Sequence, residues 1–214
     1  MNLHFEIFSK AMYSTWTYHK DSATLFDVGE GCANYFENRV FAINNILLTH
    51  HHGDHLLGFM PFLLTRCSAM GDQDKKINVF YPANNIRIQQ FFSFIKNYYS
   101  KESQILNLIE IKENQNILDL TENHYIRTFK TNHTEDSLGY VLVEKRRRLK
   151  KEFFGQNIRE LSKDKSIILN ETYEKRLFSY AVDVARVDPK DIEDSKLLFV
   201  DSTFLNIEDR SLSV

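Results

Sequence analysis

The sequence predicts an α/β fold in which several strand ends gather around one site. Short apolar or alternating runs, which are typical of strands, recur along the chain between segments with helical spacing. Strand ends on one edge of an open α/β sheet commonly form the functional site. Four of the predicted strands end at or beside a residue that can bind metal: His50, His133, Asp183 and Asp201.

Composition limits the class of protein. The 214 residues (1–214) are predicted to form a single domain, with 43% hydrophobic and 26% charged residues. No apolar run approaches the roughly 18 residues that would span a bilayer, so we expect no membrane association. Charged residues in the N-terminal segment argue against a signal peptide, and two cysteines are too few for a disulfide framework. A cytoplasmic location is therefore expected.

The first half of the chain begins with three predicted strands. Residues 3–8 alternate between apolar and polar side chains, as in a half-buried strand. Residues 24–28 predict a second strand, and the glycines that follow it permit a tight turn. Residues 46–49 form a short apolar run that ends directly on His50.

Helices and further strands are predicted after this point. The run LLGFMPFLLTRC suits a helix that begins at the histidines, with Pro61 tolerated near its first turn. Residues 86–99 have an apolar stripe at helical spacing, which we expect to lie in the core. Residues 143–172 are polar and irregular, and we predict an insertion there. The remaining predicted strands are 77–81, 125–131, 138–143, 177–182 and 197–200.

A dense group of potential ligands lies in residues 47–59, LLTHHHGDHLLGF. Residues two apart on a tight loop can point to one side, so His50 and His52 could share one metal ion. Asp54 and His55 could then face a second ion. Imidazole combined with carboxylate suits zinc, and also manganese or iron, better than calcium.

Two metal ions need more ligands than one loop provides. His133 and Asp183 are the best candidates, because each follows a predicted strand and a carboxylate can bridge two cations. Asp27 is expected to orient a ligand, since metal-bound imidazoles commonly donate their second N–H to a carboxylate. His51 is at a spacer position, where a surface or supporting role is expected.

These segments resemble the metallo-β-lactamase superfamily and, within it, ribonuclease Z, which removes 3′ trailers from precursor tRNA. The H-x-H-x-D-H motif points to the superfamily, and SLGYVLVEK points to ribonuclease Z. The resemblance implies a four-layer αβ/βα sandwich with a two-zinc site at one edge of the paired sheets. The matching segments are LFDVGEG, LLTHHHGDHLLGF, NHTEDSLGYVLVEK, SYAVDV and LLFVDSTF.

The resemblance also implies roles and partners. It assigns Asp54 as the general base for hydrolysis of a phosphodiester by a metal-activated water. Precursor tRNA is the implied substrate, and family members commonly form homodimers. The implied ligand set is His50, His52 and His133 for one zinc ion, Asp54 and His55 for the other, and Asp183 as the bridge.

The chain departs from the family pattern near its end. The family has one further ligand histidine, but no histidine follows His133 here. Water or another side chain could complete the second site, the sandwich could lack its C-terminal end, or the second metal could bind weakly. Val182 replaces a family glycine, and Val200 and Asp201 replace a common His-Glu pair, which leaves Asp201 as a candidate for proton transfer.

The chain contains one strongly basic run, which has two possible roles. Lys145–Lys151, KRRRLKK, predicts either a solvated loop or helix face, or a phosphate track for RNA. The protruding arm that is usual in ribonuclease Z would correspond to a basic insertion at 145–175.

One alternative function is hydrolysis of a small phosphodiester, cyclic nucleotide or lactone. Another is a non-catalytic homologue that binds RNA or a partner.

Overall fold

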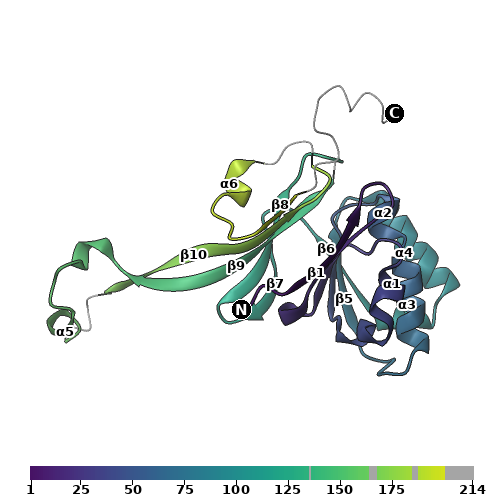
Figure 1. The fold of residues 1–214 in the computed structure, drawn as a ribbon, viewed down its shortest axis with the longest axis horizontal. Coiled ribbons are helices and arrows are strands. Elements are labelled where there is room, and N and C mark those ends of the chain that lie inside the picture. The colour runs from purple at the N-terminus through teal and green to yellow at the C-terminus, as the bar shows by residue number, and fades with distance from the viewer. Residues whose placement is uncertain (135, 164–167, 185–187, 201–214) are drawn as a thin grey trace.

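Two β-sheets packed face to face form the centre of the computed structural model, which describes residues 1–134, 136–163, 168–184 and 188–200 (Figure 1). In the first sheet, β1–β3 are antiparallel and β3–β6 are parallel. Its strands, in spatial order, are β1 (Phe5–Lys10), β2 (Ser14–His19), β3 (Thr24–Phe26), β4 (Asn45–Leu47), β5 (Ile77–Pro82) and β6 (Leu106–Ile111).

The second sheet is antiparallel except at one edge, where β10 and β11 are parallel. Its strands, in spatial order, are β11 (Leu198–Val200), β10 (Asn170–Ala181), β9 (Leu138–Leu149), β8 (His124–Lys130) and β7 (Asn116–Thr121). The predicted mixed α/β fold is confirmed.

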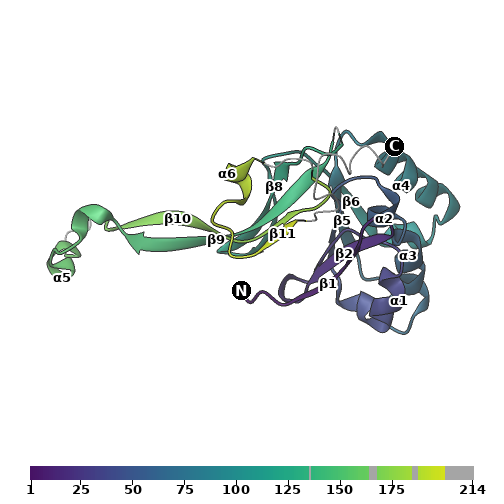
Figure 2. The same ribbon diagram turned by 45° about the horizontal axis from the view of Figure 1, so that its top comes forward.

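Helices cover the outer face of the first sheet (Figure 2). They are α1 (Cys32–Phe36), α2 (Gly53–Leu56), α3 (Phe59–Ser68) and α4 (Ile86–Tyr98). Parallel strands are normally buried on both faces, and β3–β5 accordingly consist of buried or half-buried residues. Short 3-10 helices connect elements of this half at Lys20–Ser22, Glu37–Ala42 and Glu102–Ile105, and another, Lys151–Phe153, follows β9.

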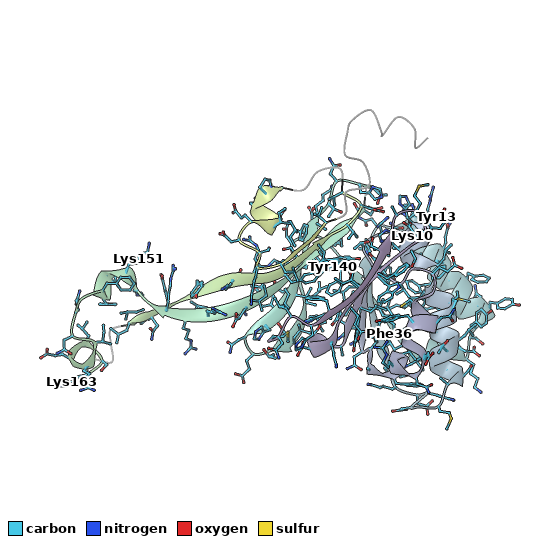
Figure 3. All side chains as sticks on the ribbon, viewed as in Figure 1. Lys10, Tyr13, Phe36, Tyr140, Lys151 and Lys163 are labelled. Carbon is cyan, nitrogen blue, oxygen red and sulfur yellow. The ribbon has the colours of Figure 1, made fainter. Side chains whose placement is uncertain are left out.

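An apolar core fills the space between the two sheets. Phe26, Leu47 and Phe80 from the first sheet pack against Tyr140 and Phe178 from the second. Tyr140 lies between the sheets in Figure 3, and its hydroxyl donates to the carbonyl of Leu48 just after β4. This contact fixes the second sheet against the strand end that carries the histidine motif.

Among the described residues, the only helix that packs on the outer face of the second sheet is short. The short helix α6 (Pro189–Ile192) contributes Ile192 to an apolar cluster with Tyr125, Phe129 and Val141. The expected four layers are thus seen as helices, sheet and sheet, with α6 in the place of the fourth. No helix in the described part of the chain is both long and apolar enough to cross a membrane.

A long hairpin leaves the body of the molecule (Figures 1 and 3). It consists of the outer parts of β9 and β10, with α5 (Ile158–Leu161) beyond them, and Lys151 and Lys163 lie near its far end. The register between the strands shifts between Arg176 and Phe178, which marks a β-bulge. We call the part from residue 144 to residue 176 the arm. Lys145–Leu149 lie in β9, so the expectation of a loop or helix face for these residues was wrong.

Candidate metal centre

The six predicted ligands come together from four places in the fold. His50 follows β4, and His52 precedes α2, which carries the next two candidates of the motif. His133 lies between β8 and β9, and Asp183 follows β10. The structure brings them into two groups, each with ligand atoms within 4.8 Å of one another: His50, His52, His133 and Asp183, and Asp54, His55 and Asp183.

One carboxylate oxygen lies at the centre of both groups. Asp183 Oδ2 is 3.3 Å from His50 Nε2 and 3.0 Å from His55 Nε2. The same oxygen is 3.7 Å from His133 Nε2 and 4.0 Å from His52 Nδ1. This arrangement of one carboxylate among four imidazoles is the geometry that a bridging ligand requires.

Hydrogen bonds behind the site fix which ring nitrogens face Asp183. Asp27, which is fully buried, accepts a hydrogen bond from His55 Nδ1 at 2.9 Å. Thr49 Oγ1 lies 2.9 Å from the same Asp27 oxygen and donates to it, so it can accept from His50 Nδ1, also at 2.9 Å. Both rings therefore carry a proton on Nδ1 and turn Nε2 toward the centre.

The two Nε2 atoms make the cluster suitable for a cation. Those of His50 and His55 are buried and have no hydrogen-bond partner in the described structure, although Asp183 is near. A lone pair that faces a carboxylate oxygen in a buried site is repulsive unless a positive charge lies between them. The donor set of imidazole nitrogens and carboxylate oxygens fits divalent metal ions.

The pKa values of the two buried histidines, His50 and His55, are shifted in opposite directions. Burial lowers the pKa of His50 to about 4, so this imidazole stays neutral. Burial also acts to lower the pKa of His55, but the carboxylates of Asp27 and Asp183 outweigh it and raise that pKa to about 10. Without metal, a proton on His55 thus supplies the positive charge between the carboxylates, and a metal ion must displace it.

The supporting residues were only partly foreseen. The structure places Asp27 where sequence reasoning expected it, behind a ligand candidate. Thr49 was missed, although its hydroxyl directly precedes His50 in the motif. The hydroxyl of Tyr180 also donates to Asp27, at 3.2 Å, and no local pattern links residues 153 positions apart. His51 belongs to neither ligand group, and its ring contacts residues at the start of α4 instead.

The structure explains one departure from the family pattern, at Val182, and does not describe the other, at Asp201. Val182 is buried between the sheets, and the next residue, Asp183, has a positive φ of 51°. Aspartate tolerates this left-handed conformation better than most residues, so the turn needs no glycine at 182. Asp201, a candidate for proton transfer, lies outside the described residues.

The sequence comparisons find relatives named ribonuclease Z. Ribonuclease Z of Sulfolobus acidocaldarius is 32% identical over 206 residues, which cover 85% of this chain and 66% of that protein. Ribonuclease Z of Natronomonas pharaonis is 30% identical over 126 residues, 58% of this chain and 39% of the relative. No family model matches the chain.

Structural comparison agrees at the level of the fold. The long form of ribonuclease Z from yeast aligns with 98% of this chain and 30% of its own, with a TM-score of 0.55 and 14% identity. This chain resembles ribonuclease Z. Its fold is the metallo-β-lactamase fold that ribonuclease Z shares, as the sequence predicted. The chain spans about two fifths of the length of the first ribonuclease Z relatives it matches, 39% and 38%.

Proposed function

We propose that this chain forms the catalytic site of a zinc-dependent phosphodiesterase of the ribonuclease Z type, which removes 3′ trailers from precursor tRNA. The observation that carries the proposal is the convergence of four imidazoles and two carboxylates at one edge of the sheets, with Asp183 Oδ2 in the middle. The resemblance also implies that the protein acts in the cytoplasm as a homodimer.

Each side chain has a role in this proposal. His50, His52 and His133 would hold one zinc ion, Asp54 and His55 a second, and Asp183 both. When bound, such ions lower the pKa of water and stabilise the charge that develops on a phosphodiester. Asp54 is partly open to solvent, so a carboxylate oxygen of its side chain can accept the proton of the attacking water.

The length of the arm favours a large substrate over a small one. β9 begins at Leu138, close to His133, and runs for 12 residues to Leu149 in the arm. At about 3.3 Å per residue this strand spans roughly 40 Å, so a substrate that touches both ends must be a folded macromolecule. A transfer RNA precursor meets this requirement, whereas a cyclic nucleotide or a lactone does not.

Charge on the arm supports RNA as that macromolecule. Arg146 pairs with Glu144 and Arg148 with Glu171 within the hairpin. Arg147 and Lys151 are exposed and form no ion pair with any residue that the structure describes. Such exposed cations are suited to phosphate groups, and lysine and arginine outnumber acidic residues along the arm although the whole chain has a net charge of -2.

The test combines metal analysis with cleavage. Protein purified without chelators or a metal-binding tag should contain two zinc ions per chain and should cut precursor tRNA at the 3′ trailer. The His52→Ala variant should lose metal and cleavage together. His4→Ala is the matched control, because His4 is exposed and outside both ligand groups.

Other outcomes identify the alternatives. Metal-loaded protein that hydrolyses bis(p-nitrophenyl) phosphate or a cyclic nucleotide but leaves precursor tRNA intact would favour the small-substrate function. Protein that binds RNA, binds no metal and hydrolyses none of these substrates would favour the non-catalytic homologue. Either result contradicts the proposed function.

A further inference from the structure

A small pocket lies beside the loop that carries His133. Its volume is ≈ 230 Å³. Three of its lining residues, Pro82, Ile111 and Leu138, are buried and apolar, whereas Asn84 and Lys112 are exposed and polar. Ligand pockets for drug-sized molecules measure about 300–1,000 Å³, so this smaller space suits a single flat ring system with polar edges.

The pocket and the metal centre are linked through the backbone. Asp136, Ser137 and Leu138 line it and end the loop that contains His133. The backbone N–H of Leu138 donates to the carbonyl of Thr49, the residue before His50, at 3.1 Å. One backbone hydrogen bond thus joins a lining residue of the pocket to the residue that precedes His50.

An unusual contact lies between this pocket and the motif. Asn84 of the pocket is followed by Asn85, whose Oδ1 accepts the backbone N–H of Ile88 at 3.1 Å. The amide nitrogen of Asn85 therefore faces His51 Nδ1, at 3.2 Å, and donates to it. On the other side of the ring, Arg87 Nη1 lies 3.1 Å from His51 Nε2.

These two contacts cannot both be good hydrogen bonds. The guanidinium of Arg87 and the oriented amide of Asn85 are both donors, and a neutral imidazole accepts at only one nitrogen. One of the two donors therefore faces an N–H of His51. In the tautomer whose Nδ1 accepts from Asn85, the N–H of Nε2 and that of Arg87, which forms no ion pair within the described residues, converge without an acceptor between them.

We propose that Arg87 and His51, together with the adjacent pocket, bind one nucleotide of the substrate next to the scissile phosphodiester. A phosphate oxygen of that nucleotide accepts from both Arg87 and His51 Nε2, which relieves the clash of donors. Its base enters the pocket, with the apolar residues against its faces and the polar residues at its edges. The proposal deepens the proposed function, because it specifies how that site holds RNA.

The experiment measures binding of adenosine 5′-monophosphate, adenosine, ribose 5-phosphate and inorganic phosphate by calorimetry or NMR titration. It uses the purified protein before and after removal of metal, so that phosphate bound by metal is recognised. Adenosine 5′-monophosphate should bind more tightly than ribose 5-phosphate, because only it has a base. Equal affinities in the metal-free protein would overturn the placement of the base.

Variants test the two halves of the subsite. Arg87→Ala should weaken binding of adenosine 5′-monophosphate by about tenfold, equivalent to about 1.4 kcal/mol. Lys96→Ala, which removes an exposed cation from the same helix, should leave it unchanged. Ala83→Phe should fill the pocket and weaken the nucleotide but not inorganic phosphate. Equal effects of Arg87→Ala and Lys96→Ala would overturn the phosphate contact.

The failure of this inference is separable from that of the proposed function. Nucleotide binding to metal-free protein requires no hydrolysis, whereas the proposed function is judged by metal content and cleavage. If the protein is active, Arg87→Ala should raise KM for precursor tRNA, whereas Lys96→Ala should leave both KM and kcat unchanged. An active protein in which KM for precursor tRNA is unchanged by Arg87→Ala would also overturn the subsite.

Discussion

Asp27 is the residue on which the geometry of the metal centre depends most. This buried carboxylate accepts from the backbone and hydroxyl of Thr49, from His55 and from Tyr180. Its own φ is 56°, in the left-handed region that few residues with side chains adopt. A residue held in such a conformation at the centre of a donor network is typical of a functional site.

Thr49 gives a test of this network. Thr49→Val keeps the shape but removes the hydroxyl that links Asp27 to His50, so His50 loses the partner that fixes its tautomer. Loss of such a supporting partner typically costs 10–100-fold in metal affinity. We therefore expect at least a tenfold higher dissociation constant for zinc, measured by competition with a chelator.

Two controls accompany this variant. Thr49→Ser keeps the hydroxyl and should keep most of the affinity. Thr24→Val removes another buried hydroxyl, which donates to the carbonyl of Ser22 far from the ligands, and should leave zinc binding unchanged. If Thr49→Val binds zinc as tightly as Thr24→Val, Thr49 does not position His50.

The individual ligand candidates were easier to predict than their supports. His50 to His55 stand together in the chain, and His133 and Asp183 each end a run with a strand pattern. The hydrogen bond from Tyr180 to Asp27 joins two sheets, and only the packed structure brings these residues together. Local sequence patterns contain no information about such a contact.

At the scale of elements, two glycines place the motif helices against the first sheet. A Cβ atom on Gly58 would lie 1.9 Å from the carbonyl oxygen of Gly29. The backbone there is tied by hydrogen bonds from Gly58 to Val28 at 2.9 Å and from Val28 to His55 at 2.7 Å. Gly58 has an ordinary φ of -71°, so close approach, and not backbone conformation, demands glycine.

Gly58→Ala should therefore destabilise the fold. The contacting atoms are backbone on both sides and cannot rotate away, so α2 and α3 must shift from the sheet. Overpacking of this kind costs about 1–3 kcal/mol of unfolding free energy. Denaturant unfolding of the metal-free protein measures it. In the control Gly53→Ala the new methyl meets only the flexible side chain of Leu57, at 3.0 Å, and equal losses in both variants would contradict this explanation.

Prediction succeeded for most elements that bury at least one face, although β2, in which every residue is buried, was missed. The helical stripe predicted for 86–99 corresponds to α4, in which Ile88, Phe92 and Ile95 are buried. The outer part of β9 was missed because its side chains are exposed on both faces, so no alternation marks it as a strand. β6 and β7 were missed for a related reason, since both contain exposed or half-buried residues at most positions.

At the scale of the whole molecule, the body and the arm should be separable. Lys145 and Arg146 are in register with Glu174 and Tyr173, so an Asn-Gly turn can join Arg146 to Tyr173 and delete residues 147–172. The shortened hairpin keeps Glu174, which pairs with Arg127 of the body at 2.9 Å. Metal content and the midpoint of unfolding should stay unchanged, because none of the described residues in the deleted part lies in the core.

RNA binding should change in this deletion. Affinity for precursor tRNA should fall, and its dependence on salt concentration should become less steep because fewer phosphate contacts remain. Hydrolysis of a small phosphodiester should continue at the same rate. Unchanged affinity and salt dependence would remove the arm from RNA binding, and loss of metal would contradict the independence of the body.

The β-bulge between Arg176 and Phe178 has a mechanical consequence. It lies where the arm leaves the sheet, and a bulge bends its strand and increases the local twist. Because the arm is long, a small change of angle at the bulge would move the far end of the arm over a much larger distance. Substitutions near residue 177 would thus re-aim the tip and leave the chemistry of the metal centre intact.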